Sequence, residues 1–163
     1  MGEPFVFMIE EYMFDSALEI LEEESSPKSS KTGGLKFKAI FQEAEEVNNN
    51  RRIYRKAALT DAIARIDGRI KSSTFFGELD HPKTDSPARF ASVMLSNASH
   101  VITALEWNNN TLQGVGKTLS TRVGRDMRAL IEEDGIKVGF SLRALGATKQ
   151  RPDGIVEVTN SVN

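Results

Sequence analysis

The fold is decided by one stretch, Val101-Ile102-Thr103-Ala104-Leu105-Glu106-Trp107-Asn108-Asn109-Asn110-Thr111-Leu112. Its first part is rich in β-branched and apolar residues, three asparagines interrupt it, and a second strand pattern follows from Thr111 to Leu119. Asparagine favours turns because its short amide can hydrogen-bond to its own backbone. Two strand patterns joined by such a turn predict a β-hairpin in an antiparallel sheet.

The segment Leu35–Gln42 alternates apolar and polar residues, as a half-buried strand requires. The alternation places Phe37 and Ala39 on the buried face and Gln42 on the opposite face. Asn48–Asn50 is a further predicted turn. Other strands are predicted at Phe5–Ile9, Phe90–Leu95, Ile136–Ala144 and Ile155–Thr159, with a turn at Arg151–Gly154 between the last two.

Two amphipathic patterns predict helices. The first spans Lys56 to Ile70, and the second surrounds Met127, with Ser120 or Thr121 as its N-cap and Gly135 as its stop. One or two helical turns are expected at Asp15–Leu21, and a polar surface loop is expected at Glu22–Gly34. We therefore predict an α+β fold: a mainly antiparallel β-barrel or strongly curved sheet, surrounded by about two or three helices.

Composition limits the class of protein. The chain has 163 residues and a mass of 18.0 kDa, which suits one domain covering residues 1–163. The net charge of −2 gives no general attraction to nucleic acid, and no apolar run is long enough to span a membrane. The chain has no cysteine, and its N-terminus lacks a secretory pattern. We expect a cytoplasmic protein that binds neither nucleic acid nor membrane.

His81 is the first candidate catalytic residue, in the motif Gly77-Glu78-Leu79-Asp80-His81-Pro82. Imidazole titrates near pH 7 and can act as a general base, and Pro82 restricts the backbone at His81. A solvated turn is an equally simple interpretation. A metal site formed by Glu78, Asp80 and His81 is a third alternative, but an extended backbone would point the two carboxylates away from the histidine.

Ser141 is the second candidate, in the motif Gly139-Phe140-Ser141-Leu142-Arg143. A serine hydroxyl becomes nucleophilic when a neighbouring base removes its proton. Gly139 permits close approach of a substrate, and Arg143 could stabilise an oxyanion. Together with His81 these groups suit acyl transfer, although Ser141 alone is more simply explained as a small strand residue.

Three strings together resemble the prohead core proteases of tailed phages, in the same order along the chain. They are Val47-Asn48-Asn49-Asn50-Arg51-Arg52-Ile53-Tyr54, the histidine motif Gly77–Pro82, and Gly139-Phe140-Ser141-Leu142-Arg143-Ala144-Leu145-Gly146. The resemblance extends from about Leu35 to Val158. This family is distantly similar to the herpesvirus assembly proteases, whose β-barrel surrounded by helices agrees with the predicted fold class.

The resemblance implies a serine endopeptidase without a cofactor or metal. It would act inside the assembling prohead, in the host cytoplasm, and cleave scaffold and capsid proteins during capsid maturation. By the same resemblance His81 is the base, Ser141 is the nucleophile and Arg143 supports the oxyanion hole. A capsid-core or assembly protein that keeps the fold without catalysis is the alternative, and a homo-oligomer is left open.

The third triad member is not identified. Relatives tend to carry an acidic residue on a strand beyond the serine, ahead of a proline-containing segment, and the sequence reaches Asn163 before such a segment. We therefore expect this residue beyond the chain end. Glu157 is the alternative within the chain, weighed against a solvent-facing strand residue. Asp80 is expected to shape its loop, and His100, the other histidine, is expected to be structural.

The resemblance also implies cleavage after glutamate, which would require a basic subsite. Four arginines are candidates for it, each weighed against simple surface solvation: Arg51, Arg52, Arg122 and Arg125.

Overall fold

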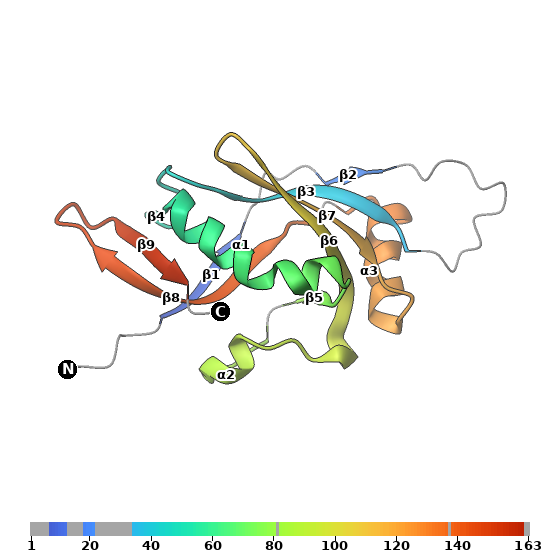
Figure 1. Cartoon of the computed structure of the whole chain (residues 1–163). Coiled ribbons are helices and arrows are strands. Elements are labelled where there is room, and N and C mark those ends of the chain that lie inside the picture. Colours follow the sequence, from blue (N-terminus) through green and yellow to red (C-terminus); the bar gives the residue numbers. More distant parts are fainter. Residues whose placement is uncertain (1–6, 13–17, 22–33, 81, 137, 162–163) are drawn as a thin grey trace.

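A computed structural model describes residues 7–12, 18–21, 34–80, 82–136 and 138–161 (Figure 1). The strands are β1 (Phe7–Tyr12), β2 (Glu19–Ile20), β3 (Lys36–Glu43), β4 (Arg52–Tyr54), β5 (Phe75–Glu78), β6 (Ala98–Asn108), β7 (Thr111–Thr118), β8 (Ser141–Gln150) and β9 (Val156–Ser161). The helices are α1 (Lys56–Lys71), α2 (Pro87–Phe90) and α3 (Arg122–Glu132), with a 3₁₀ turn, η1 (Leu95–Asn97). The described chain is therefore α+β, as predicted.

The larger sheet has the strand order β2-β3-β7-β6-β5, and all its neighbours are antiparallel. β6 and β7 form the predicted hairpin, in which Asn108 pairs with Thr111. Asn109, at the turn, has a φ of 54°, a conformation that asparagine tolerates better than most residues. The hairpin prediction is confirmed.

β3 follows the predicted alternation up to a bulge. Phe37 and Ala39 are buried, but the register against β7 shifts between Ile40 and Gln42. The extra residue reverses the face of the side chains after it, so Gln42 is buried. The prediction that Gln42 lies on the solvent face is therefore wrong.

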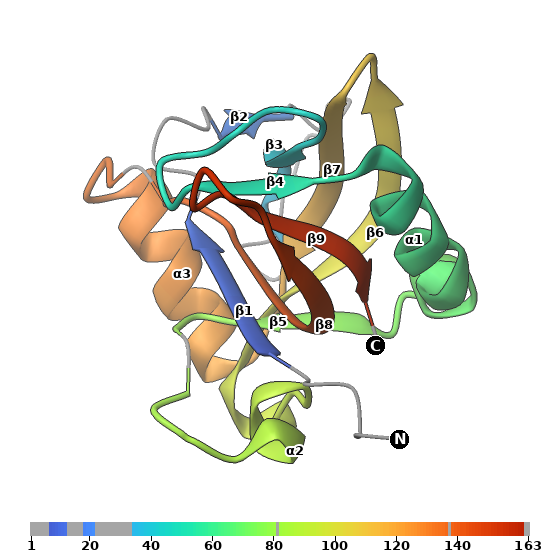
Figure 2. The ribbon, with the colours of Figure 1, turned by 90° about the vertical axis from the view of Figure 1, so that its left-hand side faces the viewer.

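The smaller sheet has the strand order β1-β8-β9-β4. β8 is antiparallel to both β1 and β9, whereas β9 and β4 are parallel, with Ile53 opposite Glu157. Figure 2 shows β1, β8 and β9 side by side. The turn before β9 ends at Gly154, whose φ of 83° suits glycine. The predicted turn at Arg151–Gly154 is confirmed.

The main core lies between the larger sheet and two helices. Phe37 and Ile102 from the sheet pack with Met127 of α3 and Ile70 of α1, and Phe140 joins them from the segment before β8. α3 contacts β6 and β7, and α1 contacts β6 and β9. The segment that leads into β8 is thereby fixed to the larger sheet.

Both predicted long helices are confirmed, with boundaries close to those expected. The Thr121 hydroxyl caps α3 by accepting a hydrogen bond of 3.1 Å from the backbone N–H of Gly124. Gly135 follows the helix with a φ of 63°. Thr121 is therefore the N-cap, and Gly135 lies where the helical turn ends.

Three predicted elements are corrected. Phe90–Leu95 is not a strand, because Ser86 caps a short helix that begins at Pro87, the position where proline is preferred. Glu19–Ile20 forms β2 rather than a helical turn, by pairing with β3. The strand expected at Ile136–Ala144 starts only at Ser141 and runs on to Gln150.

The predicted closed barrel is not confirmed, and two predicted segments lie largely or partly outside the described residues. The strands of the described residues form two sheets with open edges, so a closed barrel is not confirmed. Most of the predicted surface loop, residues 22–33, lies outside the described residues, as does the first part of the predicted N-terminal strand, before Phe7.

Phe37 is predicted to be a main determinant of stability because its side chain is completely buried in the core. Phe37→Ala should lower the free energy of unfolding by about 3–5 kcal/mol. Leu95, which is 69% exposed, provides the control, and Leu95→Ala should change it by less than about 0.5 kcal/mol. Urea denaturation of both variants measures the difference, and equal effects would refute this description of the core.

Candidate functional site

The two candidate motifs lie at the ends of strands from different sheets. β5 ends at Glu78, three residues before His81, and β8 begins at Ser141. His81 itself lies outside the described residues, and so do the side chains of Ser141 and Arg143. The contact between His81 and Ser141 therefore remains a prediction, and the described geometry is that of the segments beside them.

The flanks of the two motifs meet at the ring of His100. Phe140, directly before Ser141, lies edge-on to this ring, with ring centroids 5.4 Å apart and planes at 87°. The backbone of Gly77 lies close to the imidazole, since a Cβ at this position would be 2.1 Å from Nε2 of His100. Gly77 belongs to the histidine motif, so one side chain contacts residues of both motifs.

Gly77 is therefore constrained by a close approach. Any larger residue would force the His100 ring to move. Phe37 lies on the same aromatic cluster, stacked on Phe140 at 5.0 Å and edge-on to His100 at 6.0 Å. This cluster anchors Phe140, and with it the start of β8, to the larger sheet.

A β-bulge lies directly beside His100. The β5–β6 register steps from Gly77 opposite His100 to Glu78 opposite Ala98, which leaves Ser99 as the extra residue. Bulges redirect side chains and are frequent beside active sites. Ser99 is fully buried, and its hydroxyl lies 2.9 Å from Nδ1 of His100.

The imidazole of His100 is neutral at pH 7. Burial lowers the pKa of His100 from its usual 6.5 to about 4. The ring is neutral, its Nδ1 is hydrogen-bonded to Ser99, and it packs against the rings of Phe37 and Phe140. These features suit a packing role better than proton transfer. This environment agrees with the prediction that His100 is structural.

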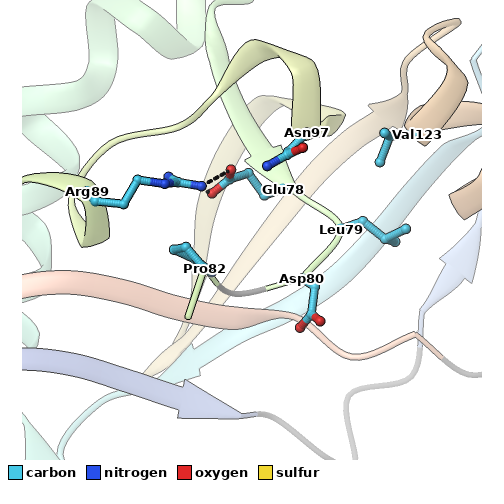
Figure 3. Close-up of a pocket in the computed structure, with 7 residues that line it drawn as sticks. All are labelled: Glu78, Leu79, Asp80, Pro82, Arg89, Asn97 and Val123. Atoms are coloured by element: carbon cyan, nitrogen blue, oxygen red, sulfur yellow. Dashed lines mark hydrogen bonds and ion pairs between the residues drawn. The ribbon is translucent and has the colours of Figure 1, made fainter. Parts of the chain in front are cut away.

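A cavity of about 280 Å³ opens beside the histidine motif (Figure 3). Its lining residues come from the segment around His81, from α2 and its neighbours, and from the start of α3: Glu78, Leu79, Asp80, Pro82, Arg89, Asn97 and Val123. The lining includes Leu79, Asp80 and Pro82 of the histidine motif. The volume would accommodate a side chain of a bound polypeptide.

An ion pair fixes one wall of this cavity. The guanidinium of Arg89 donates to both oxygens of Glu78, at 2.7 and 3.4 Å. The Glu78 side chain is only 2% exposed, so its charge is neutralised away from water. The backbone N–H of Met94 also donates to this carboxylate at 3.4 Å. Glu78 thereby joins the end of β5 to α2 and the segment that follows it.

The carboxylates of the histidine motif are not arranged as an extended strand would place them. The strand ends at Glu78, and the chain bends at Leu79 and Asp80. Figure 3 shows Glu78 directed at Arg89 and Asp80 directed elsewhere. The expectation that Glu78 and Asp80 share a face is therefore not met. Among the described residues no three metal-binding side chains form a cluster.

Comparison with known proteins gives the family. A family model described as "Prohead core protein serine protease" matches residues 13–163. The chain belongs to this family. The prohead core protein protease of Enterobacteria phage T4 is 30% identical over 123 residues, which is 74% of this chain and 55% of that protein. The chain thus spans about half the length of this curated relative.

A solved structure supports the same assignment. The bacteriophage T4 capsid assembly protease, gp21, superimposes with a TM-score of 0.77 at 25% sequence identity. The alignment covers 98% of this chain and 92% of that structure. The predicted resemblance to prohead proteases is confirmed.

Within the described part of the chain, no helix is both long and apolar enough to cross a membrane.

Glu157 lies opposite a part of β8 that is well separated from Ser141. It accepts a hydrogen bond from Nε of Arg55, and its register partner in β8 is Lys149. Lys149 is eight residues along β8 from Ser141, or about 26 Å of strand. The geometry thus favours a structural ion pair for Glu157.

The four arginines considered for a basic subsite do not line the cavity. Arg51 donates to the carbonyl of Asp153 at 2.7 Å, and Arg125 donates to the carbonyl of Ser120 at 3.1 Å. Arg122 lies 3.7 Å from Asp126 on the same helix face, and Arg52 lies in β4. These positions give no support to a shared subsite.

Arg89 is the arginine that lines the cavity, and sequence analysis did not identify it. The available signal was Ser86-Pro87, a capping residue followed by proline, which predicts a helix start and places Arg89 on its first turn. The apolar residues from Phe90 to Leu95 suggested a strand instead.

Because His100 is neutral in the folded protein, we predict that the protein loses stability in acid. The folded pKa of about 4 lies below the unfolded value of 6.5, so protonation favours the unfolded chain. The stabilisation is complete above pH 6.5 and is lost as the pH falls towards 4, by about 3 kcal/mol at most.

Urea unfolding at pH 7, 5.5 and 4 measures this loss, with His100→Gln as the comparison because glutamine does not titrate. Between pH 7 and 4 the wild-type protein should lose more stability than the variant does. Identical pH profiles would show that His100 is not held neutral.

Proposed function

We propose that the chain is a serine endopeptidase that cleaves scaffold and capsid proteins inside the prohead during capsid maturation. One observation carries the proposal beyond family membership: the flanks of the histidine and serine motifs, 60 residues apart in sequence, converge on His100. A serine mechanism needs a base and a hydroxyl close together, and this convergence supports such an arrangement.

In the proposed mechanism, the Ser141 hydroxyl attacks the carbonyl carbon of the scissile peptide bond while His81 accepts its proton. The carbonyl oxygen becomes an oxyanion, which Arg143 helps to stabilise. The bond to nitrogen then breaks, the leaving amine takes the proton from His81, and Ser141 is left as an acyl ester. A water molecule, deprotonated by His81, attacks the ester and regenerates the hydroxyl.

We also propose that cleavage follows glutamate and that Arg89 contributes to the basic subsite. Arg89 lines the cavity beside the histidine motif, and its side chain is 24% exposed. Arg89 is ion-paired with Glu78, so the carboxylate of a substrate would compete with Glu78 for the guanidinium. Such a subsite would bind glutamate moderately and release it readily.

A serine-reactive fluorophosphonate probe tests the proposed nucleophile. The wild-type protein should be labelled at Ser141, and cleavage of the phage scaffold protein should fall by about 10⁴-fold or more in Ser141→Ala and in His81→Ala. Ser96→Ala is the matched control, because Ser96 is an exposed serine on η1.

The result would be read by mass spectrometry of the labelled peptide and by gel analysis of the scaffold. Labelling and cleavage that persist in Ser141→Ala would refute the assigned nucleophile. A folded wild-type protein without labelling or cleavage would favour the alternative, a capsid-core or assembly protein that lacks catalysis.

A further inference from the structure

The segment that follows β5 and carries the histidine motif is not held by burial. β5 ends at Glu78, and α2 begins at Pro87. Between Glu78 and Arg89 none of the described residues is buried, and residues 82–86 have no regular secondary structure. A surface segment of this kind has many accessible conformations unless specific contacts restrict it. The position of the motif relative to the sheets therefore depends on such contacts.

The ion pair between Glu78 and Arg89 joins the two ends of this segment (Figure 3). The residues are 11 positions apart, and the guanidinium donates to both carboxylate oxygens, at 2.7 and 3.4 Å. The same guanidinium donates to the carbonyl of Ser92 at 2.9 Å. Charge-assisted hydrogen bonds in a two-point arrangement fix the orientation of the partners as well as their distance. His81 belongs to the stretch of chain that this pair closes.

Arg89 lies on a helix that contacts the strand of the proposed nucleophile. Phe90, the next residue of α2, is only 5% exposed and secures the helix to the fold. α2 also contacts β8, the strand that begins at Ser141. The ion pair therefore connects the end of β5 to a helix in contact with β8.

We propose that Glu78 and Arg89 are positioning residues for the proteolysis, because their ion pair holds the segment of His81 in place relative to β8. The inference rests on the proposed function, since it takes His81 as the base and Ser141 as the nucleophile. Neither member of the pair transfers a proton. The base must lie within hydrogen-bond distance of the hydroxyl, and a misplacement of about 1 Å can lower a rate about 100-fold.

This role is compatible with the proposed contact of Arg89 with a substrate glutamate. A guanidinium has five N–H donors, and the shorter bond to Glu78 uses one of them. The bond at 3.4 Å can be exchanged for a substrate carboxylate while the bond at 2.7 Å remains. Glu78 also keeps the hydrogen bond from the backbone N–H of Met94. The positioning contact thus persists when a substrate is bound.

The rate of labelling by a fluorophosphonate probe tests the positioning role, because the probe reacts with the serine and carries no glutamate. Glu78→Gln keeps the size of the side chain but replaces one accepting oxygen by an amide group that cannot accept from Arg89. This variant and Arg89→Gln should each be labelled at least about tenfold more slowly than the wild-type protein. The double variant should be slowed by about the same factor, because the two residues act as one unit.

Glu106→Gln is the matched control, because Glu106 also forms an ion pair, of 2.7 Å with Lys38, but does not line the cavity. It should be labelled at the wild-type rate. Urea unfolding shows whether each variant is folded under the labelling conditions. If Arg89→Gln is unfolded because it leaves a buried carboxylate unpaired, Glu78→Gln and the double variant decide, since neither contains that carboxylate.

Steady-state kinetics separate positioning from a role in binding or in folding alone. With a peptide that has glutamate before the scissile bond, Glu78→Gln should lower kcat at least about tenfold without raising KM. If Glu78 only competed with the substrate for Arg89, its replacement would lower KM and leave kcat unchanged. If its role were only structural, the folded variant would keep both constants. Either of these last two results would overturn the proposal.

The labelling experiment also distinguishes this inference from the proposed function. Folded variants of Glu78 and Arg89 that are labelled as fast as the wild-type protein would overturn the positioning role and leave the serine mechanism intact. A folded wild-type protein that is neither labelled nor able to cleave the scaffold protein would reject the proposed function, and the positioning role with it.

Discussion

The arrangement of the candidate site depends on the packing of His100 between Gly77 and Phe140. Gly77 belongs to the strand that leads to the histidine motif, and Phe140 precedes the proposed nucleophile. The two segments lead to strands of different sheets, and the pairing of β5 with β6 places His100 opposite Gly77. Small changes in this contact would shift one motif relative to the other, and positional errors of about 1 Å reduce catalysis strongly.

The surroundings of the site are rigid for separate physical reasons. Stacking on Phe37 holds Phe140 in the core, and the ion pair between Glu78 and Arg89 holds the end of β5 against α2. Catalytic groups placed at the ends of well-packed strands are positioned more accurately than groups on long loops.

Local patterns predicted much of this fold, and nonlocal contacts account for what was missed. The β6–β7 hairpin, α1 and α3 follow from turn residues and periodicity within single segments. The parallel pairing of β4 with β9 joins residues about 100 positions apart, and no local pattern encodes it. Likewise, the sequence identified the motifs around His81 and Ser141, but the contact of His100 with both flanks depends on tertiary packing.

The most direct measurement of this central contact is an NMR pH titration of the imidazole protons. The chain has two histidines, so His81→Gln leaves the signals of His100 alone. We expect these signals to show no titration above about pH 5, because burial lowers the pKa of His100 to about 4. Signals that titrate near pH 6.5 would contradict the account.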